Sequence, residues 1–137
     1  MLGSGGQRVS VAIGFLAGFV VSALAGCGSS SGPPRYELSG NVTWNGQPVA
    51  EGMITFEPLD MPDPLGDGVA QIRDGEFDTS VDGRGHFGGK HRVIITGSSG
   101  TLIDPQNPDS GTKPLFKPYE TTVEFPKKRS TQDFTVE

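Results

Sequence analysis

The 137-residue sequence has few of the residues that usually carry chemistry or cross-links, with one cysteine, two histidines and one tryptophan. A single cysteine excludes a disulfide within the chain, so an apolar core has to stabilise the fold. The histidines, His86 and His91, belong to no HExxH or other local zinc motif. Basic residues are also scarce, since 11 lysines and arginines stand against 16 acidic residues and the net charge is -5. This acidity argues against a nucleic-acid partner and against docking on anionic lipid by charge.

One long apolar run is present, at residues 9–25 behind the single basic residue Arg8, and this layout is typical of a secretory signal peptide. It ends in Leu24-Ala25-Gly26-Cys27, which resembles the lipobox of bacterial lipoproteins. The resemblance implies that residues 1–26 are a signal peptide cut between Gly26 and Cys27. It also implies that the Cys27 thiol carries a diacylglyceryl group and that the new amino terminus receives an acyl chain such as palmitate. Two or more acyl chains hold a protein firmly on a membrane.

An uncleaved transmembrane helix is the alternative, because a run of 17 residues reaches the lower limit of about 17 to 25 for a membrane span. The glycines and serines within the run weaken a permanent span. On the lipoprotein interpretation, the protein is held on the extracytoplasmic side of a membrane of the cell envelope, periplasmic or outer. Residues 27–35 are then the lipidated cysteine and a flexible tether of small residues and proline, reaching on the order of 15 Å.

Alternating apolar and polar residues begin at Tyr36 and recur in short segments through residues 36–137. The dipeptides Asn45-Gly46 and Asp74-Gly75 favour tight reversals between such segments. Val93-Ile94-Ile95 is β-branched throughout and suggests a central strand covered on both faces. We therefore predict an all-β fold, a seven-stranded antiparallel β-sandwich with no helix. Its expected strands are residues 36–44, 52–58, 69–73, 76–80, 90–96, 119–125 and 132–136.

Three stretches carry a more specific resemblance. Residues 39–49, Ser-Gly-Asn-Val-Thr-Trp-Asn-Gly-Gln-Pro-Val, and the Gly-led segment 52–56 resemble the opening of carboxypeptidase regulatory-like domains. Residues 88–95, Gly-Gly-Lys-His-Arg-Val-Ile-Ile, are similar to a Gly-Lys-Tyr-Arg-Val strand of the same domains. The resemblance covers residues 36–137 and implies a transthyretin-like (prealbumin-like) fold.

The same resemblance implies no shared activity, because members of this family have none in common and fold alone does not assign function. The zinc peptidase activity in the family name belongs to a separate catalytic domain that has no counterpart in this sequence. His91 stands where the family usually has a tyrosine, so we expect it to be a packed aromatic ring.

A possible contact site lies at the end of the segment 97–117. This segment has no clear secondary structure and is longer than most connections between strands. Phe116, Lys117 and Tyr119 bring aromatic and basic groups together on a proline-flanked stretch. The alternative is that Phe116 and Tyr119 plug the open end of the sandwich.

Metal and nucleotide sites have weaker support. Asp60, Asp63 and Asp67, with Asp104, Asn107 and Asp109, offer oxygen ligands for calcium, but their spacing differs from that of an EF-hand and solvated acidic loops are the alternative. Apart from the covalent lipid at Cys27, we expect no cofactor. The GxGxxG match at residues 83–88 is expected to be a tight loop, because a strand and not a helix is predicted to follow it.

The favoured interpretation is a lipid-anchored, non-catalytic module of the bacterial cell envelope that binds or scaffolds protein or polysaccharide. The alternative is a small extracytoplasmic hydrolase or metal-dependent enzyme that uses His86 or His91 with acidic residues from distant parts of the chain.

Overall fold

Short strands with alternating burial make up nearly all of the fold in the computed structural model, which describes residues 3, 32–61 and 66–137. The chain divides into two units, and the fold belongs to the second, Ser31–Glu137. The expected signal peptide, the cleavage site at Gly26 and Cys27, most of the tether and Asp63 lie outside the described residues. No helix among the described residues is long and apolar enough to cross a membrane.

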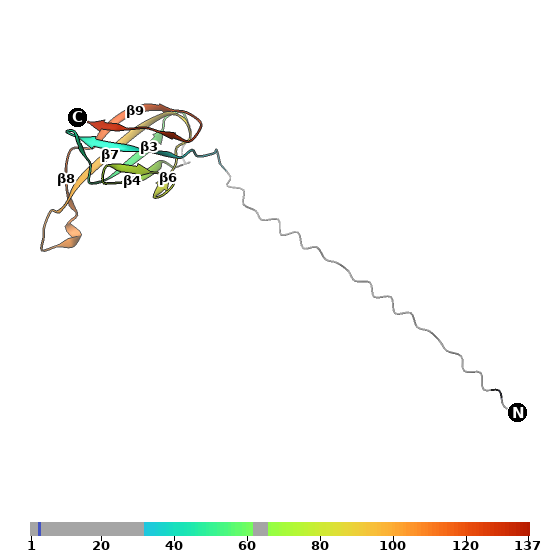
Figure 1. Cartoon of the computed structure of the whole chain (residues 1–137), viewed down its shortest axis with the longest axis horizontal. Coiled ribbons are helices and arrows are strands. Elements are labelled where there is room, and N and C mark those ends of the chain that lie inside the picture. Colours follow the sequence, from blue (N-terminus) through green and yellow to red (C-terminus); the bar gives the residue numbers. More distant parts are fainter. Residues whose placement is uncertain (1–2, 4–31, 62–65) are drawn as a thin grey trace. The chain divides into compact units, whose positions relative to one another are not determined.

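Eleven strands and one short 3-10 helix occur in the described residues (Figure 1), and the predicted all-β class is confirmed. Each of the seven expected segments corresponds to one strand, and the four additional strands are two or three residues long. Strands this short show no period in the sequence, which is why the predicted number was too low. The elements are β1 (Leu38–Trp44), β2 (Gln47–Pro48), β3 (Glu51–Pro58), β4 (Gly68–Arg73), β5 (Glu76–Asp78), β6 (Gly83–Arg84), β7 (Gly89–Leu102), η1 (Pro108–Ser110), β8 (Thr112–Pro114), β9 (Tyr119–Phe125), β10 (Ser130–Thr131) and β11 (Phe134–Val136).

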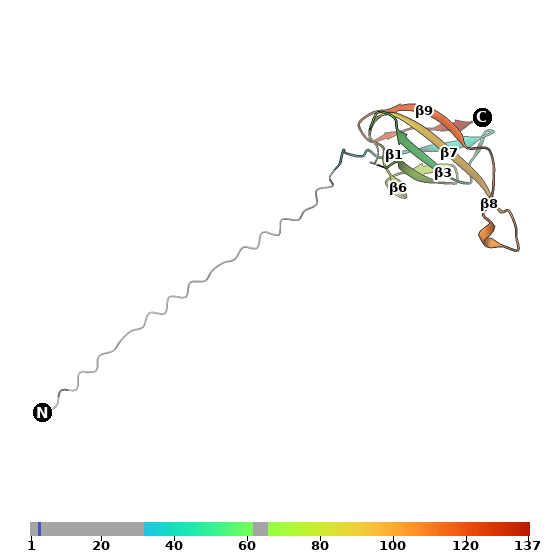
Figure 2. The same cartoon turned by 180° about the vertical axis from the view of Figure 1, so that it is seen from behind.

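The strands form one hydrogen-bonded sheet and not the two sheets of the predicted sandwich. Its order is β10-β1-β5-β4-β3-β7-β8, with β9 beside β7 and β11 beside β1. The sheet is continuous at this point because Asp74 and Gly75, with φ angles of 51° and 78°, form a tight turn that connects β4 directly to its neighbour β5. The sheet curls around the core, as Figures 1 and 2 show.

Two pairings are parallel, which departs from the purely antiparallel prediction. β10 and β11 both pair with β1 in the parallel sense. The chain reverses after β9, at the end of the sheet where β1 begins, so the last strands run in the direction of β1. The first and last strands of the domain are therefore neighbours.

Four phenylalanines from separate strands form the centre of the core. The Phe56 ring lies 6.1 Å from the Phe77 ring and 5.7 Å from the Phe125 ring, and Phe77 lies 6.1 Å from Phe134. These contacts connect β3, β5, β9 and β11, so the core ties both margins of the curled sheet to its middle. Aromatic pairs at such distances add to the stabilisation that area burial provides.

The long strand β7 corrects two expectations. Residues 97–102, expected to open a loop, continue the strand, and β8 pairs with them at Ser98 and Leu102. Serine and glycine have low β-propensity, so pairing with β8 and not the local sequence extends the strand. β7 is central, since it lies between β3 and β9, but it is covered on one face only: Val93 and Ile95 are buried whereas Ile94 is half-buried.

The sheet has two distinct ends. The tether end, where the chain enters the domain at Arg35, holds Pro58, Gly68, Gly89 and Phe125. The far end holds Trp44, Glu51, Arg73, Ser98 and Val136. Both cartoons show an arm formed by the last part of β7, η1 and β8 at the far end (Figures 1 and 2).

The Phe56 ring is expected to dominate core stability. Phe56→Ala should lower the free energy of unfolding by about 3–5 kcal/mol, because the substitution leaves a cavity beside the rings of Phe77 and Phe125. Met53→Ala, on the opposite face of the same strand where Met53 is 46% exposed, is the matched control and should change it by less than about 1 kcal/mol. Urea denaturation of the two variants measures the difference, and similar losses would contradict the proposed centre of the core.

Candidate functional site

An open groove of about 500 Å³ lies on the described surface beside β5. Residues from β1, β4, β5, β10 and the turn at residues 79–82 line it. Polar and charged side chains predominate, among them Asn41, Gln71, Arg73, Glu76, Asp78 and Asp82. Phe77, which is almost fully buried, also contributes to the lining, and Val81 at 81% exposure adds an apolar rim.

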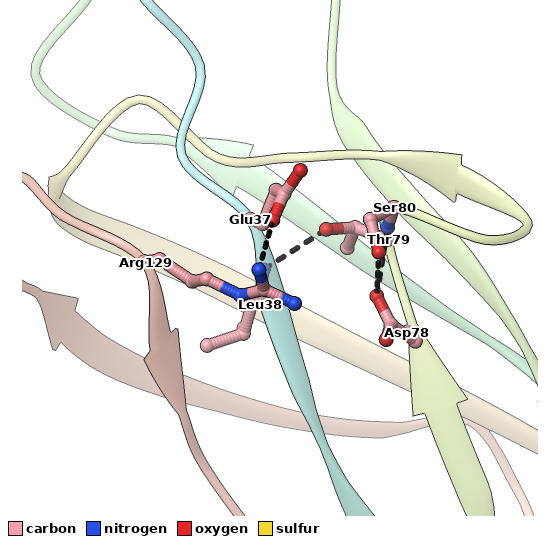
Figure 3. A network of polar contacts seen from close by, with 6 residues as sticks. All are labelled: Glu37, Leu38, Asp78, Thr79, Ser80 and Arg129. Atoms are coloured by element: carbon pink, nitrogen blue, oxygen red, sulfur yellow. Dashed lines mark hydrogen bonds and ion pairs between the residues drawn. The ribbon is translucent and has the colours of Figure 1, made fainter.

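The groove exists because β5 ends after three residues. Ser80 donates from its backbone N–H and its hydroxyl to Asp78 Oδ1, at 2.9 and 2.6 Å, and so bends the chain away from the sheet (Figure 3). Asp and Ser commonly form such turns by bonding to backbone groups nearby. The hydrogen bond from the Ser80 hydroxyl and then that from its N–H lower the pKa of the Asp78 carboxyl, which stays ionised in the groove.

The turn is fixed to β1 on its other side. The Leu38 N–H donates to Thr79 Oγ1 at 2.9 Å, and the Thr79 N–H donates back to the Leu38 carbonyl oxygen at 2.9 Å. Arg129 forms an ion pair with Glu37, the neighbour of Leu38, at 3.2 Å (Figure 3). This wall of the groove is therefore held by two hydrogen bonds between Thr79 and the backbone of Leu38.

On the opposite wall, the polar side chains form only weak interactions with one another. Arg73 Nη2 lies 2.7 Å from Asp82 Oδ2 and donates to Gln71 Oε1 at 3.0 Å, and both members of the ion pair are exposed. Exposed pairs contribute about 0–1 kcal/mol, so a ligand can replace these contacts at little free-energy cost. Carboxylates, amides and one guanidinium beside an apolar rim suit a hydroxyl-rich ligand. Among the described residues, no histidine or cysteine lines the groove.

His86 and His91 lie together, but inside the core and not in the groove. Their ring centroids are 5.7 Å apart, and the His86 ring lies 4.7 Å from the Phe125 ring. Both side chains have 0% exposure. His91 is thus packed among aromatic rings, as predicted.

The hydrogen bonds of the two imidazoles are local. The Gly88 N–H donates to His86 Nδ1 at 2.9 Å, and the Phe87 N–H donates to His91 Nε2 at 3.4 Å, while His91 Nδ1 lies 3.0 Å from the Gly89 carbonyl oxygen. His86 Nε2 is buried without a partner in the described residues. No described carboxylate hydrogen-bonds to either ring. This arrangement gives neither ring the access or the orienting acid that acid–base catalysis needs.

The expected contact residues divide between surface and core. Lys117 is exposed, whereas Phe116 and Tyr119 are half-buried and pack against the core. The Phe116 ring lies 5.7 Å from the Trp44 ring and also covers Gly97, where an added Cβ would meet Phe116 Cε1 at 2.6 Å. The geometry favours the alternative in which the two aromatics close the end of the core.

The described calcium candidates lie in two separate parts of the domain. Asp60 and Asp67 lie towards the tether end, while Asp104 and Asn107 use their side-chain oxygens to accept from the N–H groups of Gln106 and Asp109, at 2.9 and 3.1 Å. Nowhere in residues 32–61 and 66–137 do three His, Cys, Asp or Glu side chains gather closely enough to hold a metal ion. The side-chain oxygens of Asp104 and Asn107 thus stabilise the turn within the arm itself.

The glycine-rich segment 83–88 contains one strand and precedes another. Its first two residues form β6 and β7 follows at Gly89, so a phosphate would meet no helix amino terminus there. Gly85 is required for close packing, since an added Cβ would lie 2.2 Å from the Tyr36 carbonyl oxygen. The expected tight loop is thus only part of this segment, because Gly83 and Arg84 form β6 and His86 forms an antiparallel bridge with Tyr36.

Sequence reasoning did not identify the groove. Its residues are separated along the chain and come together only through the pairing of β1 with β5 and of β5 with β4. The Asp78-Thr79-Ser80 turn was the one local signal, because Asp and Ser two positions apart often stop a strand in this way.

No protein-family model and no curated protein matches this sequence. The resemblances to bacterial lipoproteins and to carboxypeptidase regulatory-like domains therefore stay predictions.

The buried His86 imidazole should make stability depend on pH. Burial, and then the neighbouring His91, lower the pKa of His86 from 6.5 to about 4. Between these values the unfolded chain binds the proton and the folded chain does not, so the free energy of unfolding should fall as pH is lowered, by at most about 1.4 kcal/mol per pH unit. His86→Phe should reduce this slope in denaturation curves at several pH values. An unchanged slope would contradict the assignment.

Proposed function

We propose that this chain is a lipid-anchored, non-catalytic β-module of the bacterial cell envelope that binds a partner in the groove beside β5. The observation that carries the proposal is the lipobox-like sequence at residues 24–27, followed closely by the folded domain. Tyr36, which already pairs with His86 through a 2.7 Å backbone hydrogen bond, is only nine positions after Cys27. Such a short tether would keep the module next to the membrane.

The character of the groove favours a hydroxyl-rich polymer, such as an envelope polysaccharide, as the bound partner. Carboxylate and amide oxygens accept from hydroxyl groups, Arg73 donates to their oxygens, and Val81 offers an apolar surface for a sugar ring. A protein partner is the other outcome that the tests below distinguish. Enzymatic use of His86 or His91 gains no support from their burial.

The resemblance to carboxypeptidase regulatory-like domains agrees with this function, because that family supplies β-modules without a shared chemical activity. The transthyretin-like topology belongs to the proposal on the same basis.

Cys27→Ser should abolish incorporation of a labelled fatty acid and release the protein from the membrane fraction, because the serine hydroxyl does not accept the diacylglyceryl group. Ser30→Ala, in the same expected tether, is the control and should leave labelling and fractionation unchanged. A Cys27→Ser variant that stays in the membrane fraction would favour the uncleaved transmembrane helix instead.

A photo-crosslinking residue at Val81 should form adducts with an envelope component in intact cells, since this side chain rims the groove and is exposed. The same residue at Lys117 tests the contact site predicted from sequence, and Thr122, exposed on β9, is the control. Polysaccharide adducts at Val81 alone would support the proposal. Adducts at Lys117 alone would move the contact to the far end, and adducts at none of the three would argue against a binding module.

A further inference from the structure

Basic residues are concentrated at one end of the domain, whereas acidic residues lie at both ends. Seven of the ten lysines and arginines in the described residues lie towards the tether end, on strand ends and loops that meet there. They are Arg35, Arg84, Lys90, Arg92, Lys127, Lys128 and Arg129. The far end and its arm instead carry many of the acidic residues, including Glu51, Asp74, Glu76, Asp104, Asp109 and Glu137.

Four of the basic side chains at the tether end are available for an external partner. Arg84, Lys90, Lys127 and Lys128 are exposed and form no ion pair with a carboxylate of the described residues. The acids near them are partly neutralised, since Glu57 pairs with Arg92 and Glu37 with Arg129. Glu124 lies opposite Lys90 in the sheet register, and Asp60, Asp67 and Asp78, which pairs with Ser39 near the start of β1, are the other described acids of this end.

Contacts between loops hold the basic groups together. Lys127 lies over the Gly88 turn, where an added Cβ would come within 2.5 Å of Lys127 Cγ. Arg35 stacks 4.2 Å above the Phe87 ring and donates to the Gly85 and Gly66 carbonyl oxygens at 2.9 and 3.1 Å. Arg35 is also close to Arg84: burial first, and then this second guanidinium, lower the pKa of Arg35.

We infer that the tether end is a membrane-docking surface, in which Arg84, Lys127 and Lys128 lie against anionic lipid head groups. Charge complementarity and the path of the chain both indicate this occupant, because the segment leading to Cys27 enters the domain at the same end. A tether reach on the order of 15 Å is comparable to the distance over which a charged surface acts, a Debye length of about 8–10 Å. The orientation rests on the proposed lipid anchor, whereas affinity for anionic lipid does not.

The net negative charge of the chain does not oppose this contact, although composition alone argued against it. Glu51 at the far end pairs with Ser98, nine residues along β7 from Gly89, so at about 3.3 Å per residue it lies roughly 30 Å from the tether end. The acidic far end is thus several Debye lengths from a bilayer that touches the tether end. Repulsion at the far end and attraction at the tether end would both keep the arm pointing away from the membrane.

Vesicle binding by matched charge variants tests the docking surface. The full chain with Cys27→Ser, which removes the lipidation site, is mixed with phosphatidylglycerol-containing vesicles or with pure phosphatidylcholine vesicles and sedimented. Each basic residue at an anionic surface contributes about fivefold to binding, so the pair Lys127→Gln and Lys128→Gln should weaken binding to the anionic vesicles by about 25-fold. Lys113→Gln and Lys117→Gln make the same change in net charge at the far end and should alter binding by less than about twofold.

Three outcomes would overturn the inference: no binding to anionic vesicles, equal binding to both kinds of vesicle, or equal losses in the two variant pairs. Residues 1–26 are the same in every variant, so any contribution from the apolar leader cancels in the comparison. Thermal unfolding of both pairs should match that of the parent chain, because all four lysines are exposed. Fatty-acid labelling of Cys27 tests the anchor separately, so failure of one test leaves the other standing.

Discussion

The contact chain Phe125–Phe56–Phe77–Phe134 allows one curled sheet to enclose a core. β9 and β11 lie at opposite margins of the pairing order, each bonded to a single neighbour, so side-chain packing has to connect them. Once the rings meet, polar residues of β1, β4 and β5 are left on the surface around the short strand, where the groove lies. At the tether end the two histidines pack against Phe125 of the same core, which explains why both imidazoles are buried.

Local alternation was sufficient to place the main strands, because Ile54 and Phe56 point inward while Met53 points outward, as a two-residue period requires. It was insufficient where pairing decides the structure. Ser98 and Gly100 are poor strand formers, yet they extend β7 because β8 lies beside it. Whether the sheet is single or split depends likewise on β4 and β5 staying paired across the Asp74-Gly75 turn.

The candidate sites differ in how far the sequence could reveal them. Lys117 lies at the surface as its neighbours suggested, but the Phe116 ring turns towards Trp44, a contact between residues distant in sequence. The groove and the basic tether end both combine groups from several strands, whereas the composition gives only the total number of charged residues. A net charge of -5 conceals an uneven distribution that becomes apparent when the direction of each strand is known.

The parallel pairing of β1 with β10 and β11 has a consequence for the order of folding. The first strand of the domain, β1, has its final neighbours 92 residues later in the chain, since Leu38 pairs with Ser130 and Val42 with Phe134. Contacts so distant in sequence form slowly, because a long loop has to close before they contribute. This topology delays completion of the sheet until β11 can pair with β1. On the proposed secretory route, this delay would help to keep the polypeptide unfolded during translocation.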